Sequence, residues 1–109
     1  MIRWEFVIRD NKFLSFSVQG HAGLAPAPHD VLCAAVSAMT QLVVNTLQEV
    51  FEAELSLQID EEKPLVAANV LSVPPESESA VQGVLQGLVL QVKDLETRYP
   101  DHLAVKIKK

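Results

Sequence analysis

Residues 14–38 read LSFSVQGHAGLAPAPHDVLCAAVSA, and the spacing of the apolar residues changes within this stretch. Apolar and polar residues alternate over residues 14–18, which predicts a half-buried β-strand. Residues 20–29 then hold two glycines and two prolines without an apolar period, which predicts a loop. Asp30 is a favoured helix N-cap, and residues 31–51 continue without glycine or proline, which predicts a helix.

The segments on both sides extend this pattern. Apolar spacing predicts strands over residues 2–8, 55–59, 65–71 and 103–107, and a second helix over about residues 77–98. The turn cluster at residues 10–12 joins the first strand to the strand over 14–18, so these two form a hairpin. The order is ββαββαβ, an α+β fold in which one mostly antiparallel sheet carries two helices. With 109 residues, the chain is expected to be a single domain over residues 1–109.

Composition and period also give expectations about packing. Only 6% of the residues are aromatic, which predicts an aliphatic core. The first half of the helix over residues 31–51 is apolar almost all round, which predicts that this end is buried. One apolar stripe of this helix is marked by Val36, Met39, Val43, Leu47 and Val50. Gly83 and Gly87 are four residues apart in the second helix, which indicates either a close backbone approach or simple tolerance of glycine.

The charge balance and the cysteine count limit the classes of function. The net charge is −5, whereas proteins grip phosphate backbones mainly through Lys and Arg, so no nucleic acid is expected as a partner. Cys33 is the single cysteine, which excludes an intramolecular disulfide. There is no apolar signal-peptide core and no run of about 18 uninterrupted apolar residues. We therefore expect a soluble, cytoplasmic protein with no membrane partner.

A group of polar residues surrounds the predicted start of the helix. Cys33 lies three residues after Asp30, in the first turn, where the helix dipole and free N–H groups favour a thiolate. Ser37 follows one turn later on the same face of the helix. His21 lies across the loop, at the end of a strand, and strand ends and helix starts commonly meet at one edge of a sheet. A cysteine next to a histidine is the general pattern of a thiol nucleophile.

Other interpretations of these residues remain open from spacing alone. A free cysteine in an apolar helix is often a buried structural residue, and Asp30 can be a helix cap without any catalytic role. A serine at the position of Ser37 commonly bonds back to a carbonyl or faces solvent. His29 is a competing base, although a charged histidine is disfavoured at a helix N-terminus. His102 is expected on a surface turn. The histidines and Cys33 lack zinc-ligand spacing, so no metal and no cofactor are expected.

The segments over residues 20–25 and 30–38 resemble the ribosomal-processing cysteine protease family, Prp. That family has a Gly-His-Ala segment, a short loop and then Asp-Ile-Val-Cys-Ala-Ala-Val-Ser, with the same separation between histidine and cysteine as here. The resemblance implies a Cys/His endopeptidase that removes the N-terminal extension of large-subunit ribosomal protein twenty-seven. It also implies a homodimer, with a fold similar to the one predicted above.

Carried over by motif position, the resemblance implies that Cys33 is the nucleophile and His21 the general base and then acid. We infer that Asp30 caps the helix and orients the site, and that Ser37 positions the dyad or the substrate. Backbone N–H groups near the helix start are expected to hold the oxyanion. The substrate is expected to bind extended against a sheet edge or against the loop, whose residues are Gly23, Leu24, Ala25, Pro26, Ala27, Pro28 and His29.

The sequence departs from the family pattern in the loop. Pro28 stands where the family commonly has glycine, and prolines fix φ, so the departure bears on loop movement and substrate selection rather than on the dyad. Two alternative functions also follow from the sequence. One is a non-enzymatic ribosome-associated module that binds a protein, and the other is a thiol hydrolase or acyltransferase that acts on small molecules.

Overall fold

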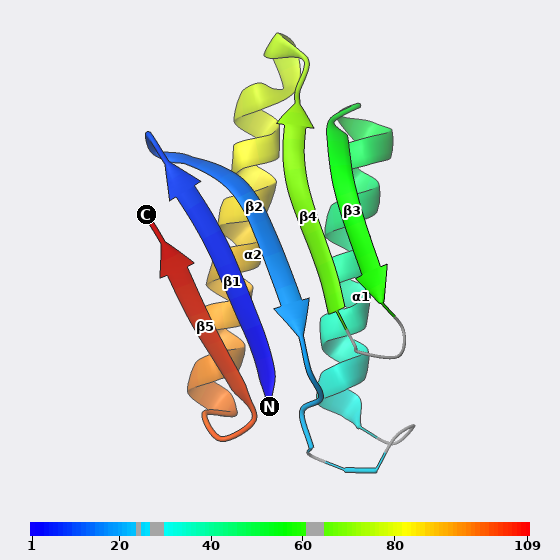
Figure 1. The fold of residues 1–109 in the computed structure, drawn as a ribbon, viewed down its shortest axis with the longest axis vertical. Coiled ribbons are helices and arrows are strands. Elements are labelled where there is room, and N and C mark those ends of the chain that lie inside the picture. Colours follow the sequence, from blue (N-terminus) through cyan, green and yellow to red (C-terminus); the bar gives the residue numbers. More distant parts are fainter. Residues whose placement is uncertain (24, 27–29, 61–64) are drawn as a thin grey trace.

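The computed structural model describes all residues except 24, 27–29 and 61–64. It contains five strands and two long helices: β1 (Ile2–Arg9), β2 (Lys12–Gln19), α1 (Val31–Asn45), β3 (Glu54–Asp60), β4 (Leu65–Ser72), α2 (Glu78–Arg98) and β5 (Leu103–Lys108). The strands form one sheet in the order β3-β4-β2-β1-β5, in which only the β1–β5 pair is parallel. Both helices cover the same face of this sheet (Figure 1). The predicted α+β fold and the ββαββαβ order are confirmed.

Aromatic rings from the first hairpin form the centre of the core. Trp4 and Phe6 of β1 are 1% and 0% exposed, and their rings stack with centroids 5.8 Å apart. Phe13 of β2 meets Phe6 edge to face at 6.2 Å, and Phe16 packs beside both β1 rings. The expectation of an aliphatic core is therefore wrong at its centre. The few aromatic residues of the chain are concentrated on one face of one hairpin.

A bulge in β2 reverses the face on which Leu14 lies. Val7 pairs with Ser15 whereas Ile8 pairs with Phe13, so Leu14 is an extra residue in its strand. The alternation in the sequence predicts that Leu14 faces inward, but Phe13 is buried and Leu14 is 40% exposed. The prediction for Leu14 is wrong because an inserted residue shifts the side-chain period by one.

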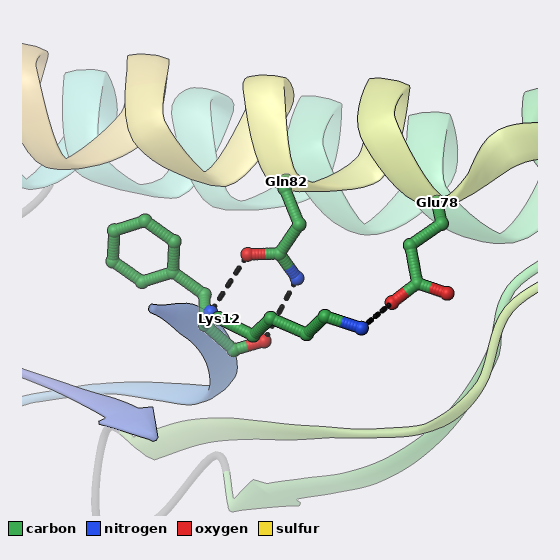
Figure 2. A network of polar contacts seen from close by, with 4 residues as sticks. Lys12, Glu78 and Gln82 are labelled. Carbon is green, nitrogen blue, oxygen red and sulfur yellow. Dashed lines mark hydrogen bonds and ion pairs between the residues drawn. The ribbon is translucent and has the colours of Figure 1, made fainter. Parts of the chain in front are cut away.

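The helix α2 bonds the backbone of Phe13, next to the bulge and beyond the residues of β2 that pair with β4. The Gln82 side chain accepts a hydrogen bond from the Phe13 N–H at 2.7 Å and donates one to the Phe13 carbonyl at 3.1 Å. Figure 2 shows Gln82 pointing from α2 at this backbone, with the Lys12–Glu78 ion pair beside it. Because an amide side chain pairs here as a neighbouring strand would, the end of the hairpin is joined to α2.

The first half of α1 is more exposed than its composition predicts. Leu32 and Val36 are buried against the sheet, whereas Val31 is 68% exposed, and Ala34, Ala35 and Ala38 are exposed as well. The expectation of a buried helix end is wrong. α1 lies over the β3–β4 side of the sheet, where a single layer covers only one face of the helix (Figure 1).

The end of this helix departs from the α-helical period. Residues Thr46–Val50 form a π-helical turn, η1, and Val50 is 65% exposed, so it does not continue the predicted buried stripe. The run Val31–Val50 has a mean hydropathy of 1.4 and is long and apolar enough to cross a membrane by composition alone. In the structure it packs on the sheet through residues such as Leu47, which is fully buried.

The second helix follows its predicted period. After the short turn η2 (Pro75–Ser77), α2 buries Val81, Leu85, Leu88, Val89 and Val92 against the sheet. Gly83 and Gly87 are exposed, and a Cβ placed on either would meet nothing within 4 Å. The prediction of a close backbone approach at these glycines is therefore wrong, and the helix tolerates them rather than requiring them.

Candidate active site

The N-terminus of α1 is built around the carboxylate of Asp30. One oxygen accepts hydrogen bonds from the N–H groups of Leu32 at 3.1 Å and Cys33 at 3.0 Å, so Asp30 is the predicted N-cap. The other oxygen accepts from the N–H of Ala25 at 3.4 Å. Asp30 is only 6% exposed. It therefore ties the loop to the helix start as well as capping the helix.

Cys33 lies in the first turn of α1 and is half-buried. Its Sγ accepts a hydrogen bond from the N–H of Ala22 at 3.3 Å. Its own backbone N–H is held by Asp30 at 3.0 Å, which keeps the side chain at the helix start. A main-chain donor aimed at the sulfur and the positive end of the helix dipole both stabilise negative charge on Sγ.

His21 follows β2 and is exposed. It lines the same groove as Cys33 and Ser37, so the structure brings the three predicted residues to one surface. Within the part of the chain that the structure describes, the hydrogen bond recorded at Sγ comes from Ala22 rather than from the His21 ring. Histidine–nucleophile contacts are often long before substrate binds, so this geometry leaves His21 able to approach the sulfur.

Gly20 sets the path of the chain from β2 to His21. Its φ is +95°, a conformation that residues with a side chain rarely adopt, and an added Cβ would collide with the carbonyl oxygen of Met1. The end of β2 therefore passes so close to the start of β1 that only glycine fits. This explains in physical terms the glycine that precedes the motif histidine.

An open groove of about 670 Å³ runs from the thiol between α1 and the sheet. Its walls are largely apolar, with Val18, Val36, Val44, Leu57, Ile59 and Val66 among the lining residues. Gln41, Asn45 and Gln48 of the helical segment and Asp60 of β3 add polar groups. Ile59 lines this groove and is 64% exposed. A concave apolar surface with a few polar groups is typical of a site that binds side chains of a ligand.

The other predicted site residues are placed as follows. The Ser37 hydroxyl accepts a hydrogen bond from the Gln41 side chain at 3.2 Å at the exposed side of α1. Gly23 and Pro26 are exposed, and Ala25 is half-buried. Leu24, Ala27, Pro28 and His29 lie outside the described residues, so the predicted substrate loop and the alternative base His29 stay predictions.

Three backbone N–H groups at the start of α1 already donate hydrogen bonds. Those of Leu32 and Cys33 donate to the Asp30 side chain, and that of Ala34 donates to the Asp30 carbonyl at 3.1 Å. The expectation that the helix start supplies oxyanion donors is therefore wrong for these three residues. The N–H of Ala22 instead lies next to the sulfur.

His102 contributes a contact that the sequence does not reveal. It is half-buried rather than free on a surface turn, and its Nδ1 lies 2.7 Å from the carbonyl oxygen of Ala22. The residues are 80 positions apart, so no local pattern could have paired them. The contact arises because β5 runs parallel to β1 from the end of the sheet at which β2 ends (Figure 1).

Known proteins resemble this chain over most of its length. The model of the family described as cysteine protease Prp matches residues 1–104. The ribosomal processing cysteine protease Prp of Bacillus subtilis (strain 168) is 30% identical over 97 residues, which are 88% of this chain and 87% of that protein. A crystal structure from Streptococcus mutans is 28% identical, with a TM-score of 0.86 over 99% of this chain and 94% of the other.

A fourth comparison shows the shared fold. The essential ribosomal processing protease Prp of S. aureus, crystallised with a covalently linked product peptide, has a TM-score of 0.87 at 20% identity. The match covers 99% of this chain and all of the other. The matching family is one of proteases, so the non-enzymatic binding module is set aside. With the family match over residues 1–104 and the close relative in B. subtilis, this chain belongs to the family of the cysteine protease Prp.

Proposed function

We propose that this protein is a cytoplasmic cysteine endopeptidase that removes the N-terminal extension of large-subunit ribosomal protein twenty-seven, with Cys33 as nucleophile and His21 as base. One observation carries the proposal. The Cys33 sulfur is half-buried at the N-terminus of α1, receives a main-chain N–H from Ala22, and opens on a groove that His21 also lines. This arrangement provides a nucleophile, a proton acceptor and room for a peptide.

In the proposed reaction, His21 takes the proton of Cys33 and the sulfur attacks the scissile carbonyl carbon. A C–S bond forms, and the carbonyl π electrons move to the oxygen. When this oxyanion collapses, the C–N bond breaks and His21 gives its proton to the leaving amine. Water, deprotonated by His21, then attacks the thioester, and the acid product leaves as the thiol is restored. The N–H of Ala22 is a main-chain donor next to the sulfur that reacts.

The shape and charge of the molecule support a basic peptide substrate. The groove is open and is lined by residues of α1 and of the strands β2, β3 and β4, which leaves room for an extended peptide. The net charge of −5 favours association with a basic ribosomal protein. Two relatives are named for ribosomal processing, and the S. aureus protease has also been crystallised with a substrate peptide.

The substrate is tested with a synthetic peptide that spans the extension of ribosomal protein twenty-seven from the same genome. We expect one cut, at the junction between the extension and the mature N-terminus, seen as two product masses. A peptide of the same composition in scrambled order is the control and is expected to stay intact. No cleavage of the junction peptide, or equal cleavage of the scrambled one, would contradict the proposed substrate.

We also propose that the protein is a homodimer. An exposed apolar stripe on α1 supports this, formed by Val31, Ala35, Ala38 and Leu42 at helical spacing. Small residues at its centre allow two helices to approach closely.

Replacing Leu42 by glutamate is expected to convert the dimer to a monomer in light scattering coupled to size-exclusion chromatography, because it places charge in the stripe. The control is Leu90→Glu on α2, a residue that is 61% exposed and outside the stripe. The proposed dimer is contradicted by a monomeric wild type, and the proposed interface by a Leu42→Glu protein that stays dimeric.

A further inference from the structure

The turn between α2 and β5 reaches the active site through His102. Three groups of this residue are bonded: its N–H donates to the Tyr99 carbonyl at 3.0 Å, its carbonyl accepts from the Ile2 N–H at 2.9 Å, and its ring contacts the Ala22 carbonyl at 2.7 Å. The backbone bonds fix the position from which the imidazole extends. The ring is therefore held against the segment that follows His21.

The chemistry of the contact determines the direction of the hydrogen bond. A carbonyl oxygen can only accept, so Nδ1 of His102 carries the proton and donates it to Ala22. Ala22 is only 2% exposed, so little water can reach this carbonyl in place of the ring. The bond selects the tautomer of His102 in which Nδ1 is protonated.

The same residue, Ala22, also contacts the proposed nucleophile. Its N–H donates to Cys33 Sγ at 3.3 Å, while its carbonyl accepts from His102 at 2.7 Å. Ala22 precedes Gly23, whose φ is +68°. Fixing the carbonyl limits the rotation of Ala22 and keeps its N–H directed at the sulfur.

We propose that His102 is a positioning residue for the Cys33 reaction: by holding the Ala22 carbonyl, it keeps the Ala22 N–H on the sulfur. The inference rests on the proposed role of Cys33 as nucleophile. His102 acts on the charge of the sulfur through the backbone of Ala22. Loss of its donor group is expected to lower the reactivity of the thiol and the turnover number, with little effect on substrate binding.

The test uses two variants of similar side-chain reach. His102→Asn keeps an N–H donor near the position of Nδ1, whereas His102→Leu fills the space without a donor. Asp101→Asn, at an exposed residue of the same turn, is the control. For each protein we measure the rate at which iodoacetamide alkylates Cys33 at neutral pH, and kcat and KM for the junction peptide.

We expect His102→Leu to lower both the alkylation rate and kcat by about tenfold, the effect of one hydrogen bond, with KM within about twofold of wild type. His102→Asn should recover most of both rates, and Asp101→Asn should match wild type. Equal rates in His102→Leu and wild type would overturn the inference, as would an asparagine variant no better than the leucine variant. A role in folding alone would lower the melting temperature without changing either rate in the folded protein.

A measurement on the wild type needs no variant. Long-range ¹H–¹⁵N NMR of the His102 ring should show the Nδ1-protonated tautomer, and a ring protonated only at Nε2 would overturn the inference.

The alkylation measurement does not depend on the identity of the peptide substrate, so it separates the two proposals. If the wild type fails to cleave the peptide but Cys33 is alkylated more slowly in His102→Leu than in the wild type, the proposed substrate is wrong and the positioning role of His102 stands. If the wild type cleaves the peptide and His102→Leu cleaves it at the same rate, only the positioning role of His102 is wrong.

Discussion

Cys33→Ala is expected to abolish cleavage of the junction peptide, with a loss of at least about 10⁴-fold in kcat, and to leave the fold intact. The sulfur forms the bond to the scissile carbon, and no other cysteine exists to replace it. The substitution removes one half-buried atom at the border of a groove, so its effect on stability is small. Cleavage is measured by product masses, and folding by circular dichroism and the melting temperature.

His21 supplies the matched comparison for this prediction. His21→Ala removes the base but leaves the thiol, so we expect a smaller loss, about 10²- to 10⁴-fold. Both variants should melt within a few degrees of wild type because His21 is exposed. Measurable cleavage by Cys33→Ala at a rate near that of wild type would show that another residue is the nucleophile. Full activity of His21→Ala would show that another group is the base.

Gly20→Ala is expected to have the largest effect on stability. The positive φ and the collision with the Met1 carbonyl each oppose a side chain, and together they should cost about 2–4 kcal/mol. For a domain of this size, that lowers the melting temperature by roughly 10–25 °C. The added side chain should also displace the backbone next to His21, so we expect cleavage by the folded protein to fall as well.

Gly83→Ala is the control for this prediction. Gly83 lies in an exposed part of α2, and an added Cβ would meet nothing within 4 Å. Alanine should therefore leave stability unchanged or raise it by up to about 1 kcal/mol, since glycine is a weak helix former. If Gly20→Ala melts as high as Gly83→Ala, the close approach between Gly20 and Met1 is not a constraint on the fold.

Local patterns in the sequence predicted the types and order of the elements. Alternation predicted the strands, Asp30 predicted the helix start, and the change of period after residue 20 separated sheet from helix. What failed depended on contacts between elements. The bulge at Leu14 depends on how β2 pairs with β1 and on the contact between Phe13 and Gln82 of α2. The exposed side of α1 depends on how much of that helix the sheet covers.

The features of the site that the sequence predicted are also local, and those that it missed join distant segments. The spacing of His21, Asp30 and Cys33 is local. The structure places Asp30 and Cys33 at the start of α1, and His21 and Cys33 line one groove. The N–H of Ala22 at the sulfur and the His102 ring at the Ala22 carbonyl join segments 11 and 80 residues apart. The His102 contact requires β5 to lie beside β1, and no local motif carries either contact.

The covalent bond between Cys33 and the substrate is the central step of the proposed mechanism. The enzyme is mixed with the junction peptide, quenched with acid within the first turnover, and analysed by intact mass and peptide mapping. We predict an adduct equal in mass to the acyl portion of the peptide, located on Cys33 as a thioester and absent from Cys33→Ala. Product formation without an adduct at Cys33, or an adduct at another residue, would contradict the account.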